Sequence, residues 1–413
     1  MSFSYQNHSL HIESVDIADL MDDYGSPLYV YSRSDVENNW REFDSAFGTH
    51  PHLVCYAVKA NSNLAVLNVL ARIGAGFDIV SIGELERVLA AGGDASKCVF
   101  SGVAKTEYEI KRGLEVGIRC FNVESSSEMS RIGEVAQSLN IQAPVSVRVN
   151  PNIDAKTHPY ISTGLKENKF GVDINDAIEL YQLAHNSKSL RVVGLDCHIG
   201  SQITDVSPFL DALDKVVELI NKLKDNGIEI AHLDLGGGVG IKYDDEQTID
   251  ISAYINEIMN RTGNLEIILE PGRAIVGNAG AFVTKVEFLK QNSDKSFAII
   301  DGAMNDLLRP AFYNAYHQVL PVNENSNGVD ASWDLVGPIC ETGDFLAKDR
   351  KLSLSQGDYL AVMSAGAYGF TMSSNYNSRP RVAEVMVDGV QHYLIRERET
   401  IKDLFKQEHI IND

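Results

Sequence analysis

The sequence has few cysteines and no long apolar run, and both shortages narrow the class of protein. Its five cysteines are spread over 413 residues, without a Cys-x-x-Cys pair or a cluster with histidine. This spacing argues against a disulfide framework and gives no zinc motif. No apolar run of about 18 residues occurs, and aspartates stand near the N-terminus where a signal peptide needs a basic and then an apolar region. We therefore expect a cytoplasmic protein without a membrane partner.

Basic residues are also scarce relative to acidic ones. The chain has 57 Asp and Glu against 36 Lys and Arg, which gives a formal net charge of −21. A surface of this sign repels nucleic acid and anionic membranes, so neither is an expected partner. An anionic ligand would have to be held locally by arginines, backbone amides and helix N-termini.

The first two thirds of the chain alternate between strand-like and helix-like segments. Eight β-branched or aromatic runs have the length of buried strands, at residues 52–58, 76–80, 98–101, 119–123, 145–150, 191–198, 228–235 and 265–270. Helical patterns separate most of them, at residues 83–91, 107–116, 126–139, 174–185 and 208–226. This order predicts a (β/α)8 barrel, with a helix at 32–47 completing the outer ring. An open doubly wound sheet is the alternative.

After residue 275 the pattern changes to short alternating runs separated by Gly, Pro and Asn. The clearest feature is Asp388-Gly389, a hairpin turn signal between two such runs. The runs lie at residues 281–289, 296–301, 318–322, 333–336, 359–363, 382–387 and 391–395. They predict an antiparallel β domain. We therefore expect an α/β fold with the barrel at 29–275 and the β domain at 276–413, joined by residues 1–28.

One lysine directly follows the first predicted barrel strand. The segment Tyr-Ala-Val-Lys-Ala-Asn places Lys59 at the carboxyl end of that strand, and in a barrel these ends form one face where residues of different strands converge. Apolar surroundings lower the pKa of a lysine, and the neutral amine can form a Schiff base with a carbonyl substrate or with pyridoxal phosphate (PLP). A lysine that simply extends to water is the alternative.

Other strand ends supply polar groups to the same face, namely Asp78, His198, Ser201, Glu270 and Arg273. Glu270 paired with a pyridine nitrogen would favour the protonated ring, the electron sink that decarboxylation needs, and a salt bridge with Arg273 is its alternative. His198 would lie flat against a cofactor ring or be an ordinary core histidine. The glycine run 236–238 would bring backbone N–H groups close to a phosphate, although a structural turn explains it equally well.

Eight segments, each a weak motif alone, occur in the order found in the diaminopimelate decarboxylase family, and the chain resembles that family from about residue 27 to residue 387. They are Tyr-Ala-Val-Lys-Ala-Asn at 56–61, Phe-Asp-Ile-Val-Ser at 77–81, His-Ile-Gly-Ser-Gln at 198–202, Gly-Gly-Gly-Val-Gly at 236–240, Glu-Pro-Gly-Arg at 270–273, Arg-Pro-Ala-x-Tyr at 309–313, Cys-Glu-Thr-Gly-Asp at 340–344 and Gly-Ala-Tyr-Gly at 366–369. Their common order and compatible spacing make the resemblance specific.

The resemblance implies an alanine-racemase-like barrel with a β domain, and an enzyme that uses PLP to convert meso-2,6-diaminopimelate to L-lysine and CO2. It implies that Lys59 carries PLP as a Schiff base, that His198 stacks on the ring and that Glu270 meets the pyridine nitrogen. The further cofactor positions implied are Asp78, Ser201, Gly236, Gly237, Gly238, Gly272, Arg273 and Tyr368, of which the glycine run and Tyr368 would bind the phosphate.

A homodimer with shared active sites is also implied by the resemblance. Cys340 would protonate the carbanion after CO2 leaves, and it would be delivered across the dimer interface together with Glu341. The substrate positions implied are Arg273, Arg309, Tyr313, Glu341 and Tyr368. Thr342 stands where the family often has serine, and no role is assigned to that side chain.

The residue types suit a substrate with a second amino acid head. Glu341 can bind the distal ammonium and Arg309 or Arg273 the distal carboxylate, while Tyr313 fixes orientation. A related decarboxylase of ornithine, arginine or carboxynorspermidine is the nearest alternative, since these substrates differ at the distal end.

Two alternatives lie further away. An amino-acid racemase would be expected to have arginine in place of Glu270, and a non-catalytic PLP carrier would have no use for Cys340 and Glu341. Residues 151–170, with His158, Tyr160 and Lys166 among them, form a long connection that is a candidate for a loop closing over the substrate.

Overall fold

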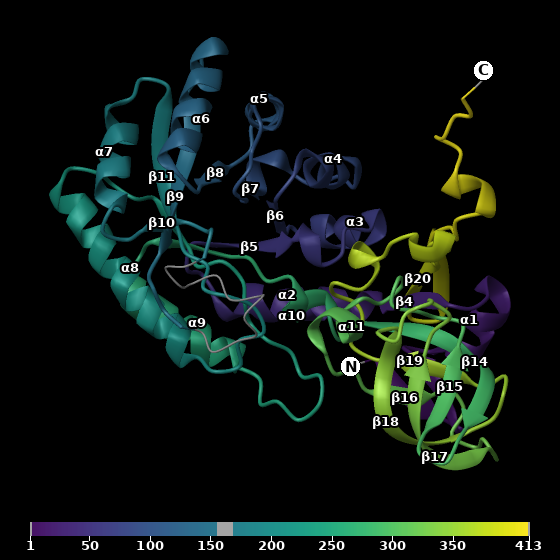
Figure 1. Ribbon diagram of the computed structural model, residues 1–413. Coiled ribbons are helices and arrows are strands. Elements are labelled where there is room, and N and C mark those ends of the chain that lie inside the picture. The colour runs from purple at the N-terminus through teal and green to yellow at the C-terminus, as the bar shows by residue number, and fades with distance from the viewer. Residues whose placement is uncertain (1, 155–167, 412–413) are drawn as a thin grey trace. The chain divides into compact units, whose positions relative to one another are not determined.

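In the computed structural model, which describes residues 2–154 and 168–411, the strand-like runs of the first two thirds form a closed parallel barrel (Figure 1). The barrel strands are β5 (His52–Ala57), β6 (Gly76–Ile79), β7 (Cys98–Phe100), β8 (Cys120–Val123), β9 (Ala143–Asn150), β11 (Leu190–Asp196), β12 (His232–Asp234) and β13 (Glu266–Leu269). Each pairs with its neighbours in that order, and the pairings β8–β9 and β13–β5 complete the circle. The barrel prediction is confirmed, and closure excludes the open sheet.

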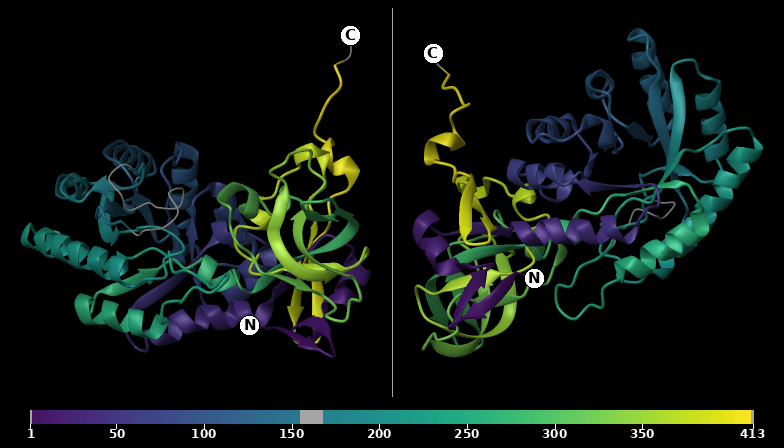
Figure 2. Two further views of the ribbon diagram at one scale, coloured as in Figure 1. Left: turned by 60° about the horizontal axis from the view of Figure 1, so that its bottom comes forward. Right: turned by 180° about the vertical axis from the view of Figure 1, so that it is seen from behind.

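Helices cover the outside of the barrel (Figure 2). They are α2 (Arg33–Ala46), α3 (Leu64–Arg72), α4 (Ile82–Ala90), α5 (Glu107–Val116), α6 (Ser126–Ser138), α7 (Ala177–Asn186), α8 (Ser207–Asp225) and α9 (Ile251–Thr262). Local signals explain their ends: α5 starts at a capping box between Thr106 and Glu109 and stops at Gly117, which has a φ of 72°. The helices α3 and α9 were not predicted. In α3 the apolar residues are almost continuous along the chain, so the helical period is weak.

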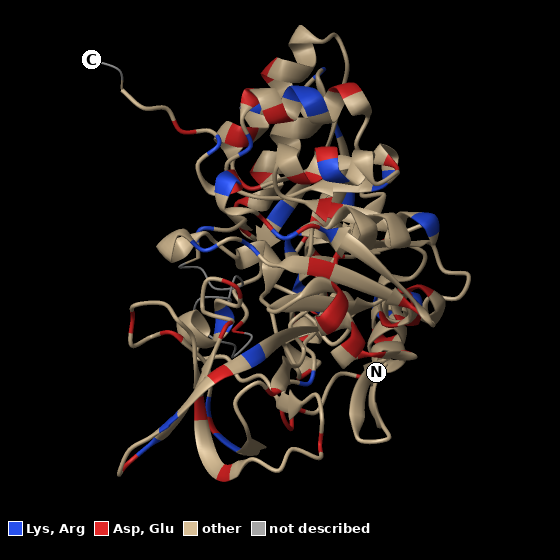
Figure 3. Ribbon diagram, turned by 90° about the vertical axis from the view of Figure 1, so that its right-hand side faces the viewer, with Lys and Arg blue, Asp and Glu red and all other residues tan. Residues whose placement is uncertain are grey.

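The chain divides into two compact units. The barrel unit comprises Glu37–Ile241 and Gln247–Ile275, and the β unit comprises Met1–Val36, Lys242–Glu246 and Val276–Asp413. Figure 3 shows acidic and basic residues intermixed along the ribbon, so the negative net charge is not confined to one element. No helix of the described residues is long and apolar enough to cross a membrane.

The β unit contains a mostly antiparallel sheet in the order β18-β17-β15-β14-β4-β20-β21, with β19 pairing both β14 and β16. Its strands are β4 (Leu28–Ser32), β14 (Gly280–Gln291), β15 (Ser296–Ile300), β16 (Val319–Pro321), β17 (Val329–Val336), β18 (Phe345–Leu354), β19 (Tyr359–Val362), β20 (Ala383–Asp388) and β21 (Gln391–Arg396). Trp333, Tyr29 and Phe282 fill its core. The predicted hairpin is present at β20–β21, where Gly389 takes a φ of 63°. The pairs β15–β17 and β4–β20 are parallel, which the sequence did not indicate.

The N-terminal boundary differs from the expected residue 29. Strand β4 lies between β14 and β20 in the β unit, and this unit extends to Val36. All five residues of β4 are buried, so the run has the same apolar pattern as a barrel strand, and only the pairing reveals where it belongs. The segment before it, with strands β1 (Phe3–Gln6), β2 (Ser9–Ile12) and β3 (Val15–Asp16) and helix α1 (Ile17–Tyr24), also belongs to the β unit.

Candidate active site

Lys59 lies where the sequence places it, in the turn η1 (Val58–Ala60) that follows β5. Its Nζ is 2.5 Å from Oδ2 of Asp78, which is fully buried on β6, while 39% of the lysine side chain is exposed. The expectation of apolar surroundings is therefore wrong in one respect, because the amine faces a carboxylate. This contact holds the amine at the carboxyl end of the strands.

Three buried carboxyl groups gather from the ends of neighbouring strands. Oxygens of Asp196, Asp234 and Glu270 lie within 4.8 Å of one another. Burial raises the pKa of Glu270 well above its usual value, and the neighbouring Asp234 adds to this shift. Burial likewise raises the pKa of Asp234 to about 6. The cluster therefore retains protons at a pH where exposed carboxyl groups have lost them, and a positive charge placed beside it would be stabilised.

One oxygen of this cluster shows whether the site can accept the nitrogen of a pyridine ring. Oε1 of Glu270 is buried and has no hydrogen-bond partner within residues 2–154 and 168–411. A buried acceptor of this kind costs free energy unless a donor reaches it. A protonated ring nitrogen would supply both the donor and the charge. The donor set on this face therefore fits PLP.

The glycine run is required by the backbone as well as suited to a phosphate. Gly236 and Gly238 have φ values of 65° and 101°, and a Cβ on Gly237 would lie 2.2 Å from the carbonyl oxygen of Glu270. The N–H of Gly236 donates to Oδ1 of Asp234 at 2.9 Å. The N–H of Gly237 is also engaged, with Nδ1 of His198. Two of the three predicted phosphate donors thus have partners within the protein, so phosphate binding would depend more on Gly238.

His198 is a half-buried, neutral histidine. The N–H of Gly237 donates to its Nδ1 at 3.3 Å, so this nitrogen presents a lone pair. Burial lowers the pKa of His198 well below its usual value, and the positive charge of Arg148 acts in the same direction. A neutral imidazole with this fixed orientation is suited to stacking on a ring.

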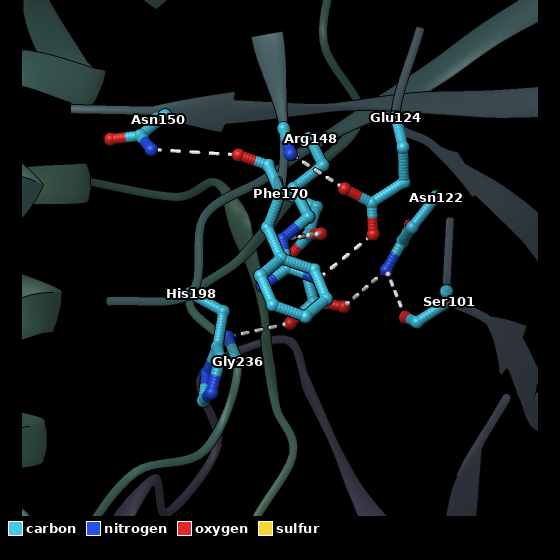
Figure 4. Close-up of polar contacts among 12 residues, drawn as sticks. Ser101, Asn122, Glu124, Arg148, Asn150, Phe170, His198 and Gly236 are labelled. Atoms are coloured by element: carbon cyan, nitrogen blue, oxygen red, sulfur yellow. Dashed lines mark hydrogen bonds and ion pairs between the residues drawn. The ribbon is translucent and has the colours of Figure 1, made fainter. Parts of the chain in front are cut away.

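A buried network beneath these groups was missed by the sequence analysis (Figure 4). Arg148 on β9 donates from Nη1 to Oε1 of Glu124 at 2.9 Å, and its Nε is 3.8 Å from Oδ2 of Asp196. Asn122 on β8 reaches Oδ2 of Asp234 with its Nδ2 at 3.4 Å. The sequence does contain one indication of this network, because Arg148 lies within the apolar run 145–150. A buried charge is rarely unpaired, so an acidic partner is expected.

Arg273 and Ser201 meet at the same ends of the barrel strands. Nη2 of Arg273 donates to Oγ of Ser201 at 3.1 Å, and Arg273 opens the short helix α10 (Arg273–Val276). The glycine before it packs against β5, because a Cβ on Gly272 would lie 2.9 Å from that of Ala57. These contacts bring together two predicted site residues from distant parts of the sequence.

The remaining predicted residues belong to the β unit. Arg309 and Tyr313 lie at the two ends of helix α11 (Arg309–Tyr313), the arginine buried and the tyrosine half-buried. Tyr368 follows β19 with a φ of 55°, a conformation that non-glycine residues rarely take outside functional sites or turns.

Cys340 and Glu341 are exposed in the loop between β17 and β18. The loop is held from within, because Asp344 accepts hydrogen bonds from the N–H groups of Met304 and Ile339, each at 2.7 Å. Tyr376 donates its hydroxyl proton to Oε1 of Glu341. The loop therefore presents both residues to the outside in an ordered conformation. The candidate lid residues His158, Tyr160 and Lys166 lie outside the described residues.

Comparison with known proteins identifies relatives over the whole chain. The family model "Pyridoxal-dependent decarboxylase, pyridoxal binding domain" matches residues 33–277. The chain is 58% identical over 413 residues to the diaminopimelate decarboxylase of Vibrio cholerae and 56% identical over 412 residues to that of Haemophilus influenzae, with 99% of each chain covered.

Solved structures give the same result. Diaminopimelate decarboxylase from Helicobacter pylori, complexed with L-lysine, aligns with a TM-score of 0.92 at 42% identity, covering 95% of this chain and 99% of that one. The enzyme from M. jannaschii, also in complex with L-lysine, aligns with a TM-score of 0.94 at 39% identity, covering 99% and 98%. A lysine/ornithine decarboxylase from Vibrio vulnificus aligns over 90% of this chain and 97% of its own with a TM-score of 0.79, but at 21% identity it shares the fold alone.

Proposed function

The chain belongs to the pyridoxal-dependent decarboxylases and, within them, to the diaminopimelate decarboxylases, and from this we infer which of its residues perform the reaction. The enzyme is a carboxy-lyase that converts meso-2,6-diaminopimelate to L-lysine and CO2 with PLP, the last step of bacterial lysine biosynthesis. One observation supports the residue assignment most strongly. Among the described residues, the buried Oε1 of Glu270 has no hydrogen-bond partner, and it lies on the barrel face that also bears Lys59.

The barrel, expected at residues 29–275, is proposed as the cofactor domain. Lys59 would hold the aldehyde carbon of PLP, His198 would cover one face of its ring and Glu270 would bind the ring nitrogen. The other proposed cofactor contacts are Asp78, Ser201, Gly236, Gly237, Gly238, Gly272, Arg273 and Tyr368. When bound, PLP supplies an electron sink for the pair of electrons that CO2 leaves behind.

Glu270 and its neighbours would keep the ring nitrogen protonated. Burial raises the pKa of Glu270 well above its usual value, and repulsion from the neighbouring Asp234 adds to this shift. Asp196 belongs to the same cluster. A cation beside Glu270 relieves this repulsion, so the cluster favours the protonated ring. Asp78, which pairs with Lys59 in this structure, would hold the lysine amine at the mouth of the barrel.

The β unit, expected at 276–413 with residues 1–28, is proposed to supply the substrate contacts. Arg309 would bind the distal carboxylate and Glu341 the distal ammonium, and Tyr313, Arg273 and Tyr368 would complete the set. Cys340 would donate a proton from Sγ to the carbon that has lost CO2, which requires a protonated thiol before turnover.

Substrate preference tests this assignment. The purified enzyme with PLP is expected to decarboxylate meso-diaminopimelate at least about a thousandfold more efficiently than ornithine, lysine or arginine, because these leave a carboxylate-binding arginine unpaired. Replacing Arg309 with alanine is expected to raise KM for meso-diaminopimelate and to reduce this ratio, measured as kcat/KM by CO2 release. Efficient turnover of ornithine by the wild type would contradict the role given to Arg309.

We further propose a cytoplasmic homodimer in which Cys340 and Glu341 complete the site of the partner subunit. Their exposure on an ordered loop supports this arrangement, and the free cysteines suit a reducing compartment.

Mixing two inactive variants tests the shared site. Lys59→Ala and Cys340→Ala dimers that exchange subunits are expected to recover about a quarter of the wild-type activity, because half of the random dimers are mixed and each has one intact site. Activity after mild dissociation and reassociation measures this recovery, and Lys59→Ala mixed with itself is the control. No recovery, despite mixed dimers seen by native mass spectrometry, would place Cys340 in the site of its own subunit.

A further inference from the structure

Three buried side chains of the β unit form a group around the guanidinium of Arg309. Its Nη1 is 2.9 Å from Nε2 of His317, and the guanidinium carbon is 4.6 Å from the centroid of the Tyr243 ring. The rings of Tyr243 and His317 meet edge to face, with their centroids 5.2 Å apart. At most 7% of any of the three residues is exposed. The arginine is therefore held from its edge and from one face.

The hydrogen bonds of His317 determine which of its nitrogens carries the proton. Nδ1 is 2.8 Å from the carbonyl oxygen of Met363, which can only accept, so the proton is on Nδ1. Nε2 then presents its lone pair to the N–H of Arg309. The imidazole is neutral in this arrangement, since a second proton would set one N–H against another.

The sheet fixes the position of His317. Strands β16 and β19 pair antiparallel from Val319 opposite Val362, and the N–H of Met363 donates to the carbonyl oxygen of Gln318 at 2.8 Å. His317 is the next residue along this ladder. Its ring is thus anchored at the end of a hydrogen-bonded pair of strands.

Tyr243 reaches the group from a different part of the chain. It lies in the segment Lys242–Glu246, which follows the glycine run in sequence but belongs to the β unit. Oε2 of Glu246 accepts the N–H groups of Tyr243 and Asp244 at 2.9 and 2.8 Å and so holds the segment in a turn. The aromatic face against Arg309 is therefore supplied by an ordered backbone.

These contacts orient the guanidinium without neutralising it. Arginine recognises a carboxylate best through two parallel N–H···O bonds, which require its plane to be fixed. His317 fixes the plane at Nη1 and Tyr243 covers one face, and neither partner is an anion. We propose that His317 and Tyr243 are positioning residues that make Arg309 selective for the carboxylate of the distal amino acid head. This inference rests on the substrate role of Arg309 proposed above.

Two inhibitors separate this role from a general structural one. L-lysine retains the distal carboxylate, whereas cadaverine is the same diamine chain without it. In the PLP-loaded enzyme, His317→Phe is expected to raise the inhibition constant of L-lysine and KM for meso-diaminopimelate about tenfold, because the guanidinium loses its fixed plane. The inhibition constant of cadaverine and kcat are expected to change less than about threefold, since neither depends on that carboxylate contact.

Further variants keep the test informative if one of them folds poorly. Tyr243→Leu is expected to reproduce the effect of His317→Phe, and His317→Gln to restore part of the affinity, because its amide oxygen can accept from Arg309. His392→Phe is the matched control, since this β-unit histidine also bonds a neighbour, Tyr24, at 2.8 Å, and no change is expected. Thermal unfolding of each holoenzyme verifies folding.

A double variant separates the positioning role of His317 from the substrate role of Arg309. In an Arg309→Ala background, His317→Phe is expected to add no further loss of L-lysine inhibition. An additive loss, or equal weakening of L-lysine and cadaverine in the single variant, would overturn the positioning role. If Arg309→Ala alone leaves L-lysine inhibition unchanged, the substrate role of Arg309 fails first.

Discussion

Lys59→Ala is expected to lose the visible absorbance of lysine-bound PLP and to lower kcat by at least about three orders of magnitude, as loss of a covalent catalytic group commonly does. The expected loss follows from the position of Lys59. Lys59 ends a buried strand and its Nζ is held 2.5 Å from Asp78, so an aldehyde at the barrel mouth meets one preplaced amine. Absorbance spectra, steady-state turnover and the mass of the borohydride-reduced peptide measure the effect.

Lys59→Arg is the matched control for this experiment. Arginine keeps the positive charge beside Asp78 and therefore preserves the ion pair, but it cannot form a Schiff base. We expect this variant to unfold at nearly the wild-type temperature and still to lack the chromophore. A chromophore that persists in Lys59→Ala and maps to another lysine peptide after reduction would show that Lys59 is not the cofactor lysine.

Glu270→Gln is expected to lower kcat by about a hundredfold, because removing a charge that stabilises a developing charge in a buried site costs on this order. Glutamine has the same shape but cannot favour a protonated ring nitrogen by charge. KM for meso-diaminopimelate is expected to change little, since Glu270 does not face the distal head in our assignment. A kcat within about threefold of the wild type would contradict the electron-sink role.

The same substitution has a second readout in the protein without PLP. The folded state raises the pKa of Glu270 above its usual value of 4.5, first through burial and then through Asp234. As pH rises above about 4.5, the unfolded chain releases this proton before the folded chain does, so the folded state loses stability. Glutamine carries no such proton. We therefore expect thermal unfolding of apo Glu270→Gln to depend less on pH above 4.5 than that of the apo wild type, and an identical dependence would contradict this.

The strand ends show why part of the site was predictable. Parallel strands of a barrel deliver their carboxyl ends to one face, so a lysine after β5 and a glutamate after β13 converge although the sequence separates them widely. Lys59 and Glu270 each interrupt an otherwise apolar run, which made both visible. Asp234 gives a similar signal between two leucines, but a short acidic interruption of this kind also fits an ordinary strand end.

Contacts between distant segments were not predictable. Nothing in the sequence near Tyr243 or His317 indicates that both rings meet Arg309, because each residue lies in a separate segment whose partner is chosen by the sheet. Arg148 and Glu124 form an ion pair across the neighbouring strands β8 and β9, and the sequence of either strand alone does not indicate this partner.

The order of apolar and polar residues by itself determined the barrel, the β hairpin at Asp388-Gly389 and the chemistry available at the strand ends, because side-chain periodicity and turn chemistry are local properties. The tertiary structure alone decided that β4 joins the β unit, that a carboxyl cluster surrounds Glu270, and that a neutral His317 aligns Arg309. Those features depend on which buried strands pair with each other. Strands with the same apolar pattern cannot be told apart locally, and only the complete fold selects their partners.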